Sequence, residues 1–482
     1  MNKRVFTAAL LLSLMLSLST RAGLTVTKGL AAYQVLQCDE NDTAQASCSG
    51  TWTQDGDMPV QGRLMQDNAV VLEWQDIGTT VSGTWQGVLE GIPVGGPYTI
   101  ELRAGDDTCL INPVLAGDLW ILAGQSNMQG VGNTIDMVPP NPSAHMLAMN
   151  GVWRTASDPL HILQESIDPV HYRPESEEEQ RKAVEAARNW PKGAGLGMPF
   201  AIEMIQRTGR PVGLVCTAHG GTSMEQWNPD KKEMEGESLY GSMLAQVRRA
   251  GGKVHGVLWY QGESDANPDA AAVFPKKFET LVAAIRQDLH QPELPFYYVQ
   301  IGRFTHPDPK PGPWNLIQTM QLAAEKSIPN SGMVASIDLA LDDLIHIGTP
   351  GLKRLGVRLA NLVAHDLYDG TVLAGPRPEN ASYIDTPYGK QIHVTFSGVN
   401  ERLAAQGRPV GFSISSGSEG DTVPFLYKVE LPEDAPDTAI LWVHELPKNP
   451  QVWYGRGLDP CANITDEADM AVPVFGPLPV IK

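Results

Sequence analysis

The sequence predicts an α/β fold, in which a five-stranded parallel sheet is covered by helices and flanked along the chain by two β-rich sections. Between residues 116 and 373, short apolar runs alternate with helical stretches, the pattern of a parallel sheet with helices on both faces. On either side, alternating runs such as 84–89 and 391–396 are typical of antiparallel strands. We therefore expect four parts: a signal peptide at 1–22, an N-terminal β-rich domain at 23–115, the α/β domain at 116–373 and a C-terminal β-rich section at 374–482.

The elements of the α/β domain can be placed along the chain. Buried strands are predicted at residues 118–123, 211–217, 254–259, 296–301 and 333–337. Helices are predicted at 198–208, 238–250, 270–290, 315–326 and 350–368. Residues 131–173 form a long, proline-rich and mostly irregular insert, which a charged helix at 175–190 follows. Long loops at strand ends often build binding sites, so the insert is expected to supply pocket walls.

The first 22 residues have the composition of a secretory signal peptide. Lys3 and Arg4 precede an apolar stretch at 5–18, and small residues around Ala22 favour cleavage after that position. The stretch is shorter than the roughly 20 residues that a membrane-spanning helix needs, although an uncleaved anchor is the alternative. We expect a secreted or periplasmic protein without a membrane anchor after cleavage.

Charge and cysteine content limit the classes of partner and cofactor that the chain is expected to bind. The formal charge of −19 disfavours nucleic acid and anionic membranes as partners. Five cysteines are too few to build a disulfide scaffold in 482 residues, and Cys38 and Cys48 are either bridged or reduced and buried. Because no CxxC motif or His/Cys cluster is present, we expect no metal and no other cofactor.

The motif GQSNM at 124–128 is the main candidate for a catalytic site. It follows the apolar run 119–123, so a buried strand ends in a tight turn that presents the hydroxyl of Ser126. A serine at a strand-to-helix turn can act as a nucleophile beside main-chain N–H groups. The alternative is an ordinary turn that carries a serine without function.

Three further segments follow other predicted strands, at the edge where open α/β sheets place their sites. Among them, Asp343 and His346 are spaced so that their side chains can meet across one turn, and a carboxylate beside histidine would fix its tautomer. Asp342 is the alternative partner. His346 would then accept the proton of Ser126.

An oxyanion formed at this serine needs fixed hydrogen-bond donors. The main-chain N–H groups of Ser126 and Gly221 are the expected donors, and the side-chain amide of Gln261 is a third. Glu263 is expected to orient neighbouring loops as a supporting residue, through hydrogen bonds to main-chain N–H groups.

These motifs resemble those of the SGNH-type carbohydrate O-acetylesterases, and most closely of the sialate O-acetylesterase family. The similarity rests on GDLW at 117–120 leading into GQSNM, on WYQGES at 259–264 and on DxxH at 343–346. The resemblance implies an SGNH-hydrolase-like, flavodoxin-like three-layer domain. It also implies Ser126 as nucleophile, His346 as general base and acid, and Asp343 as the residue that orients it. The third motif lacks the asparagine of the wider SGNH pattern and has Gln261 instead. The family's proline after the histidine is also missing, and Ile347 stands there.

The sequence thus favours a secreted serine esterase that removes O-acetyl groups from carbohydrate through an acetyl-enzyme intermediate. By the resemblance, its substrate is sialate-like. One alternative is an acetylesterase for plant polysaccharide such as xylan or xyloglucan, and another is a noncatalytic carbohydrate-binding protein. The expected partner of the esterase is an acetylated carbohydrate substrate.

Overall fold

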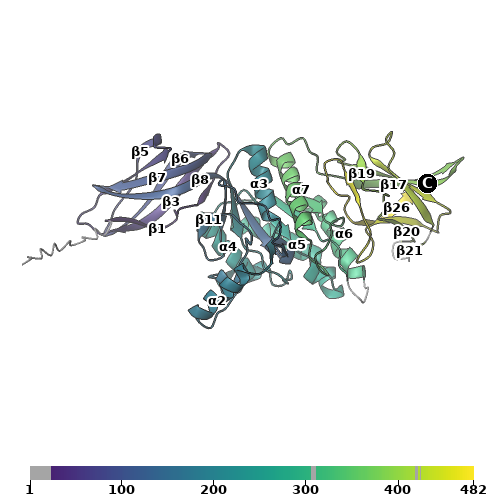
Figure 1. Cartoon of the computed structure of the whole chain (residues 1–482), viewed down its shortest axis with the longest axis horizontal. Helices are drawn as coiled ribbons and strands as arrows, with labels where there is room; N and C mark the ends of the chain where they lie inside the picture. The colour runs from purple at the N-terminus through teal and green to yellow at the C-terminus, as the bar shows by residue number, and fades with distance from the viewer. Residues whose placement is uncertain (1–22, 306–310, 418–421, 424, 482) are drawn as a thin grey trace, which may run out of the picture.

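Three groups of elements follow one another along the chain (Figure 1). The computed structural model describes residues 23–305, 311–417, 422–423 and 425–481. The expected signal peptide at 1–22 lies outside these residues. In the described part of the chain, no helix has both the length and the apolar content needed to cross a membrane.

A parallel sheet forms the central group, in the order β10-β13-β8-β14-β15-β16. The strands are β8 (Asp107–Gly124), β10 (Ala144–Leu147), β13 (Val212–Cys216), β14 (Gly256–Tyr260), β15 (Phe296–Gln300) and β16 (Ser331–Ala335), and the antiparallel β11 (Trp153–Thr155) pairs with β10. All five predicted strands are present. The predicted number is nevertheless wrong, because β10 is a sixth parallel strand among the described residues. It has only four residues and lies in the insert that was expected to be irregular.

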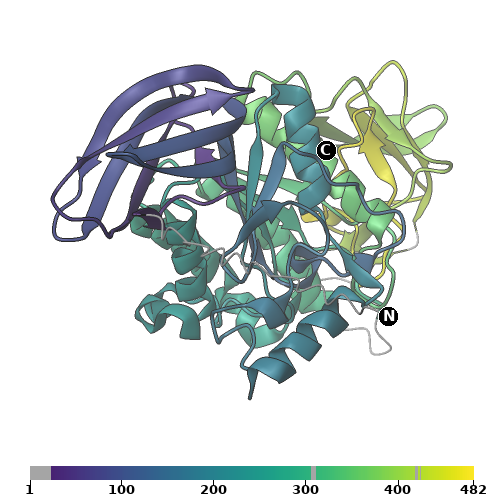
Figure 2. The ribbon, with the colours of Figure 1, turned by 60° about the vertical axis from the view of Figure 1, so that its left-hand side comes forward.

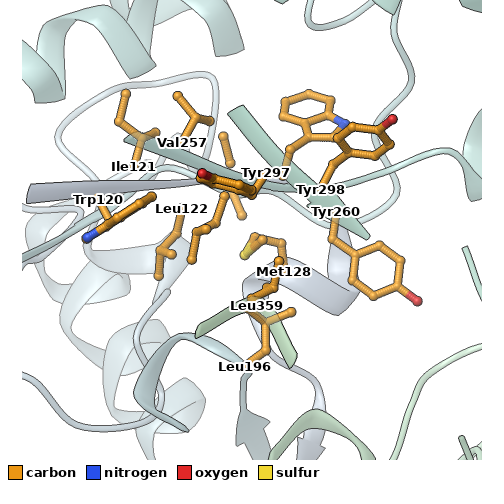
Figure 3. Packing of buried hydrophobic residues seen from close by; sticks show 14 of the residues in the cluster. Trp120, Ile121, Leu122, Met128, Leu196, Val257, Tyr260, Tyr297, Tyr298 and Leu359 are labelled. Atoms are coloured by element: carbon orange, nitrogen blue, oxygen red, sulfur yellow. The ribbon is translucent and has the colours of Figure 1, made fainter. Parts of the chain in front are cut away.

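Helices cover both faces of this sheet. They are α3 (Gly197–Thr208), α4 (Leu239–Ala250), α5 (Pro268–Asp288), α6 (Pro311–Ser327) and α7 (Thr349–Leu367). Alternate residues of a strand point to opposite faces of the sheet, so aromatic side chains of the strands contact helices on both faces. Trp120 packs on Phe200 of α3, with ring centroids 5.1 Å apart, whereas Tyr298 packs on Phe278 of α5 at 5.2 Å. The buried cluster between sheet and helices includes Met128, directly after the Ser126 turn (Figure 3).

Side-chain caps fix where several helices begin. Ser238 accepts the N–H of Gly241 at 3.0 Å at the start of α4, and Asn267 accepts that of Ala270 at 3.0 Å at the start of α5. Ser176 does the same for α2 (Glu177–Arg188), the charged helix expected at 175–190. Each cap satisfies a main-chain donor that has no partner within the helix. The short elements of this group are α1 (Ser126–Gln129), η1 (Leu163–Glu165), η2 (Pro229–Glu237), η3 (Glu263–Asp265) and the strand pair β9 (Gly132–Asn133) and β12 (Lys192–Ala194).

The N-terminal group is an antiparallel sheet in the order β1-β3-β6-β5-β4-β7-β8. It contains β1 (Leu24–Lys28), β3 (Thr43–Trp52), β4 (Pro59–Gln66), β5 (Ala69–Thr79), β6 (Thr84–Pro93) and β7 (Gly95–Ala104), and β2 (Val35–Gln37) pairs with β8. Strand β8 pairs with β7 in its first half and with β13 and β14 in its second half. One unbroken strand therefore crosses residue 115. The division of the chain at 115 and 373 stays a prediction.

The C-terminal group lies on the other side of the central sheet (Figure 2). Its main sheet has the order β21-β20-β24-β26-β17-β18-β23-β22. The strands are β17 (Arg377–Thr386), β18 (Gly389–Ser397), β20 (Phe412–Ser416), β21 (Thr422–Val423), β22 (Leu426–Glu430), β23 (Thr438–Val443), β24 (Pro450–Tyr454) and β26 (Phe475–Ile481), with β19 (Leu403–Ala405) and β25 (Ile464–Asp466) as a separate pair. Each of the three groups has its own hydrophobic cluster. Cys38 and Cys48 are both buried and unbonded.

Candidate active site

The turn that carries Ser126 begins where β8 ends. Gly124 has a φ of 127°, and a Cβ on it would lie 2.2 Å from the carbonyl oxygen of Tyr260, so glycine is needed there. Ser126 is the first residue of α1 and is half-buried. Its main-chain N–H has no partner within the helix, as for any first helical residue.

Ser126, His346 and Asp343 form one line of hydrogen bonds. Ser126 Oγ lies 2.9 Å from His346 Nε2, and His346 Nδ1 lies 2.9 Å from Asp343 Oδ2. An ionised carboxylate only accepts, so Nδ1 carries the ring hydrogen and Nε2 accepts the hydroxyl hydrogen of the serine. Asp342, the alternative partner of the histidine, accepts the N–H of Asn133 at 3.4 Å instead. The geometry is that of a serine prepared for deprotonation by histidine.

Asp343 is held ionised by its neighbours. Burial acts to raise the pKa of this carboxyl, but hydrogen bonds from Lys192, His346 and the N–H groups of Ile345 and His346 hold the pKa well below its usual value. Lys192 Nζ lies 2.9 Å from Asp343 Oδ2, the oxygen that also faces the histidine. The carboxylate therefore stays a pure acceptor for the imidazole.

The glycine loop after β13 reaches Ser126 through Gly220. A Cβ placed on Gly220 would lie 3.4 Å from Ser126 Cβ. Beyond the chain neighbours of Gly221, no atom of the described residues lies within 4 Å of its Cβ position. The N–H of Gly220 donates to Gln129 Oε1 at 2.7 Å. Gly221 stays a predicted donor, with a φ of 70° that suits glycine.

Gln261 differs from its expected role as a donor to an oxyanion. Its Nε2 donates to the carbonyl oxygen of Thr222 at 3.1 Å and to Asp265 Oδ2 at 2.6 Å. A primary amide has two hydrogens, and both are used. The side chain is fully buried, so we interpret Gln261 as a link between the loops after β13 and β14 rather than as an oxyanion donor.

Glu263 is linked to the serine turn through the side-chain amide of Asn127, a partner that was not predicted. Its Oε1 accepts Asn127 Nδ2 at 2.9 Å, and Asn127 Oδ1 accepts the N–H of Ile347 at 3.1 Å. Asn127 Nδ2 also lies 3.5 Å from the carbonyl oxygen of Ile345. One amide therefore joins the serine turn, the loop after β14 and both neighbours of His346. Burial raises the pKa of Glu263 to about 7, against the lowering effect of the bond from Asn127.

Sequence reasoning missed Asn127 and Lys192 as contributors to this site. Asn127 stands beside the serine in the GQSNM motif, but its partners are 136 to 220 residues away in the chain, so no local pattern reveals them. Lys192 is 151 residues from Asp343 and belongs to no motif. Within the described residues, no group of three or more His, Cys, Asp or Glu side chains is arranged to hold a metal ion.

Comparison with known proteins gives consistent matches. The family model described as carbohydrate esterase, sialic acid-specific acetylesterase matches residues 116–365. A probable carbohydrate esterase of Arabidopsis thaliana is 28% identical over 284 residues, which cover 54% of this chain and 95% of that protein. Human sialate O-acetylesterase is 24% identical over 302 residues, which cover 54% of this chain and 55% of that protein. The chain thus matches only about half the length of the human protein.

Among solved structures, a carbohydrate acetylesterase from Xanthomonas citri superimposes with a TM-score of 0.68 at 21% identity, covering 94% of this chain and 98% of that one. This likeness is one of fold, and it extends over the flanking β groups as well as the central sheet. The family model covers more than half of the 482 residues and includes Ser126, Asp343 and His346. The chain therefore belongs to the sialic acid-specific acetylesterase family of carbohydrate esterases, which are carboxylic ester hydrolases.

Proposed function

We propose that the protein is an exported serine esterase that removes O-acetyl groups from carbohydrate. The observation that carries this proposal is the hydrogen-bonded line from Ser126 Oγ through His346 to Asp343, with both distances at 2.9 Å. Ser126 is the proposed nucleophile, His346 the general base and acid, and Asp343 the group that holds the imidazole.

The reaction proceeds in two halves. Ser126 Oγ attacks the acetyl carbonyl carbon while His346 Nε2 takes the hydroxyl proton, and the tetrahedral oxyanion forms beside the N–H groups of Ser126 and Gly221. The sugar oxygen then leaves with the proton from His346, and acetyl-serine remains. Water attacks the acetyl group as His346 takes its proton, acetate leaves, and the proton returns to Ser126 Oγ.

The substitution Ser126→Ala tests this mechanism. We expect the variant to lose at least about a thousandfold in kcat on p-nitrophenyl acetate, because nucleophilic catalysis is removed. Its circular dichroism should match that of the wild type. Turnover at the wild-type rate would contradict the mechanism. Glycan binding without any hydrolysis by the wild type would instead favour the noncatalytic carbohydrate-binding alternative.

The substrate has two candidates. The family description supports an O-acetylated sialate. A neutral plant polysaccharide such as acetylated xylan or xyloglucan is supported by the cavity that Gln129 and Lys192 help to line. Lys192 is the one charged side chain in its described lining and is already bound to Asp343. Acetate release from O-acetylated sialoglycan and from acetylated xylan, measured side by side, separates the two.

Export is proposed from the composition of residues 1–22. N-terminal sequencing of the protein recovered outside the cytoplasm should give Gly23 as the first residue. An intact start at Met1 would contradict cleavage.

A further inference from the structure

A network of polar side chains connects α4 and the long insert to the glycine loop that follows β13. It consists of Asp168 and His171 from the insert, Ser242 and Arg249 from α4, and His219 from the loop itself. Asp168, Ser242 and His171 are 5%, 0% and 7% exposed, so the middle of this Asp168 network is buried. The proposed reaction uses none of its side chains.

The hydrogen bonds of the Asp168 network all run toward the carboxylate. Arg249 donates to both oxygens of Asp168, each at 3.1 Å. Ser242 Oγ lies 2.7 Å from Asp168 Oδ2, and since an ionised carboxylate only accepts, the serine donates its hydrogen there. Ser242 Oγ then has no hydrogen left for His171 Nε2, which lies 3.1 Å away, so this ring nitrogen is the donor.

This direction determines the tautomers of both histidines. A neutral imidazole has one hydrogen, so His171 with its hydrogen on Nε2 accepts at Nδ1. His219 Nδ1 lies 3.1 Å from that nitrogen and supplies the hydrogen between them. Burial lowers the pKa of His171 to about 3 and also lowers the pKa of His219, so both rings are neutral near pH 7. Each ring is therefore held in one tautomer and one orientation.

His219 belongs to the loop that contacts the serine turn. Its main-chain N–H donates at 3.0 Å to the carbonyl oxygen of Gly124, two residues before Ser126. The next residue is Gly220, whose Cβ position lies 3.4 Å from Ser126 Cβ. Gly221, the predicted oxyanion donor, follows directly. Fixing the side chain of His219 therefore limits how this stretch of main chain can move.

The position of this loop matters for the proposed reaction. Donors that stabilise an oxyanion are effective when they are held in place before the reaction begins. A displacement of about 1 Å can cost about a hundredfold in rate. Gly220 and Gly221 have no side chains through which packing could hold them. The Asp168 network holds the residue immediately before them.

We infer that Asp168, Ser242 and His171 are positioning residues for the oxyanion, which act through His219 on the glycine loop. The inference rests on the proposed esterase function and adds three residues to it. Among the described residues, none of the three is hydrogen-bonded to the proposed catalytic serine, histidine or aspartate, so the effect on the reaction is indirect. It should lower kcat and leave KM, because oxyanion stabilisation is made only in the transition state.

Two variants of His171 separate hydrogen bonding from ring packing. His171→Phe keeps an aromatic ring and removes both hydrogen bonds, so we expect kcat on p-nitrophenyl acetate to fall about thirtyfold, with KM within about twofold of the wild type. His171→Gln offers an amide donor to Ser242 and a carbonyl acceptor to His219, so kcat should stay within about fivefold. Loss of packing alone would not give rescue by glutamine and loss with phenylalanine.

Ser242→Ala removes the middle link, and Ser415→Ala is its matched control. Both serines are 0% exposed, and Ser415 Oγ also donates one hydrogen bond, to the carbonyl oxygen of Gly417 at 2.8 Å, and accepts one, from Trp453 Nε1 at 2.9 Å. We expect Ser242→Ala to lower kcat about tenfold and Ser415→Ala to leave it within about twofold. Added to His171→Phe, Ser242→Ala should lower kcat less than about twofold further, because the link is already broken.

Three results would overturn the inference. The first is a kcat within about twofold of the wild type in both His171→Phe and Ser242→Ala. The second is an equal loss of kcat in Ser242→Ala and in its control Ser415→Ala, which would show a general effect of lost stability. The third is a double variant whose loss is the product of the two single losses, since the two side chains would then act separately.

Failure of the proposed function gives a different result. If the wild type hydrolyses no acetyl ester, or Ser126→Ala hydrolyses p-nitrophenyl acetate at the wild-type rate, the esterase mechanism fails. The hold on the loop is then judged by hydrogen–deuterium exchange of the main-chain N–H groups of His219 and Gly220, which are both hydrogen-bonded. Exchange at least about tenfold faster in Ser242→Ala than in Ser415→Ala would retain the network as the anchor of the loop, whereas equal exchange would reject it.

Discussion

The substitution Asn127→Ala tests the amide that joins three loops of the site. It removes hydrogen bonds to Glu263 Oε1 at 2.9 Å, to the N–H of Ile347 at 3.1 Å and to the carbonyl oxygen of Ile345 at 3.5 Å. Asn127 and Ile347 are each 1% exposed, so water does not replace these bonds without rearrangement. Leaving one buried donor unsatisfied costs about 1–3 kcal/mol, and Glu263 Oε2 already lacks a partner among the described residues.

The variant leaves two buried polar groups, Glu263 Oε1 and the N–H of Ile347, without a hydrogen bond. The local stability should therefore fall by about 4 kcal/mol. Hydrogen–deuterium exchange of the peptide that contains Ile347 measures this loss directly. We expect its amide to exchange at least about a hundredfold faster, since 1.4 kcal/mol is a factor of ten. Because Ile345 and Ile347 flank His346, kcat on p-nitrophenyl acetate should fall about a hundredfold as well.

Asn150→Ala is the matched control, because Asn150 Oδ1 makes one hydrogen bond, at 3.1 Å, to the N–H of Val152 in an exposed turn. It should cost less than about 1 kcal/mol and leave kcat within twofold. If Asn127→Ala behaves like this control in both measurements, the reasoning about the shared amide is refuted.

Two further predictions concern the carboxyl groups of the site. Asp343→Asn should lower kcat on p-nitrophenyl acetate by a factor of about 10²–10⁴, because the amide can stabilise the wrong tautomer of His346. Steady-state kinetics at pH 7 measures this change. A loss below threefold would contradict the orienting role of Asp343. Glu263→Gln should flatten the pH dependence of stability. The pKa of about 7 in the folded state exceeds the ordinary value of 4.5, so the folded state binds the extra proton. The stability that this group contributes is therefore full below pH 4.5 and is lost as the pH rises through 7. Urea denaturation at pH 4.5 and pH 8 should show the wild type losing about 3 kcal/mol more than the variant across that interval, and parallel curves would disprove the assignment.

The sequence reveals most of the central sheet and the core of the site for identifiable reasons. The five predicted strands are apolar runs that alternate with helical stretches, and Asp343 and His346 are three residues apart, so their contact is local. Strand β10 was missed because it has only four residues in a proline-rich insert, too few to show a hydrophobic periodicity. Gln261 was predicted as an oxyanion donor from its position after a strand. That position does not show that its side-chain amide donates to Asp265, four residues further along the chain.

Residues in and after the long insert also could not be placed from the sequence. His161 and Trp190 lie on opposite sides of α2 in the chain, and neither belongs to a motif. The position of His161 depends on a contact with Gln129, which is 32 residues away in the chain. Long-range packing of this kind is not encoded in composition or spacing.

The continuity of β8 has a consequence for how this protein can be cut or rearranged. The strand has 18 residues and spans about 60 Å at 3.3 Å per residue, from the hairpin with β7 to the glycine before Ser126. Removing residues 1–115 would cut β8 in two and would remove β2, the strand that pairs with residues 115–117. The N-terminal sheet and the turn that carries the serine therefore share one continuous strand, and no irregular linker separates them along β8.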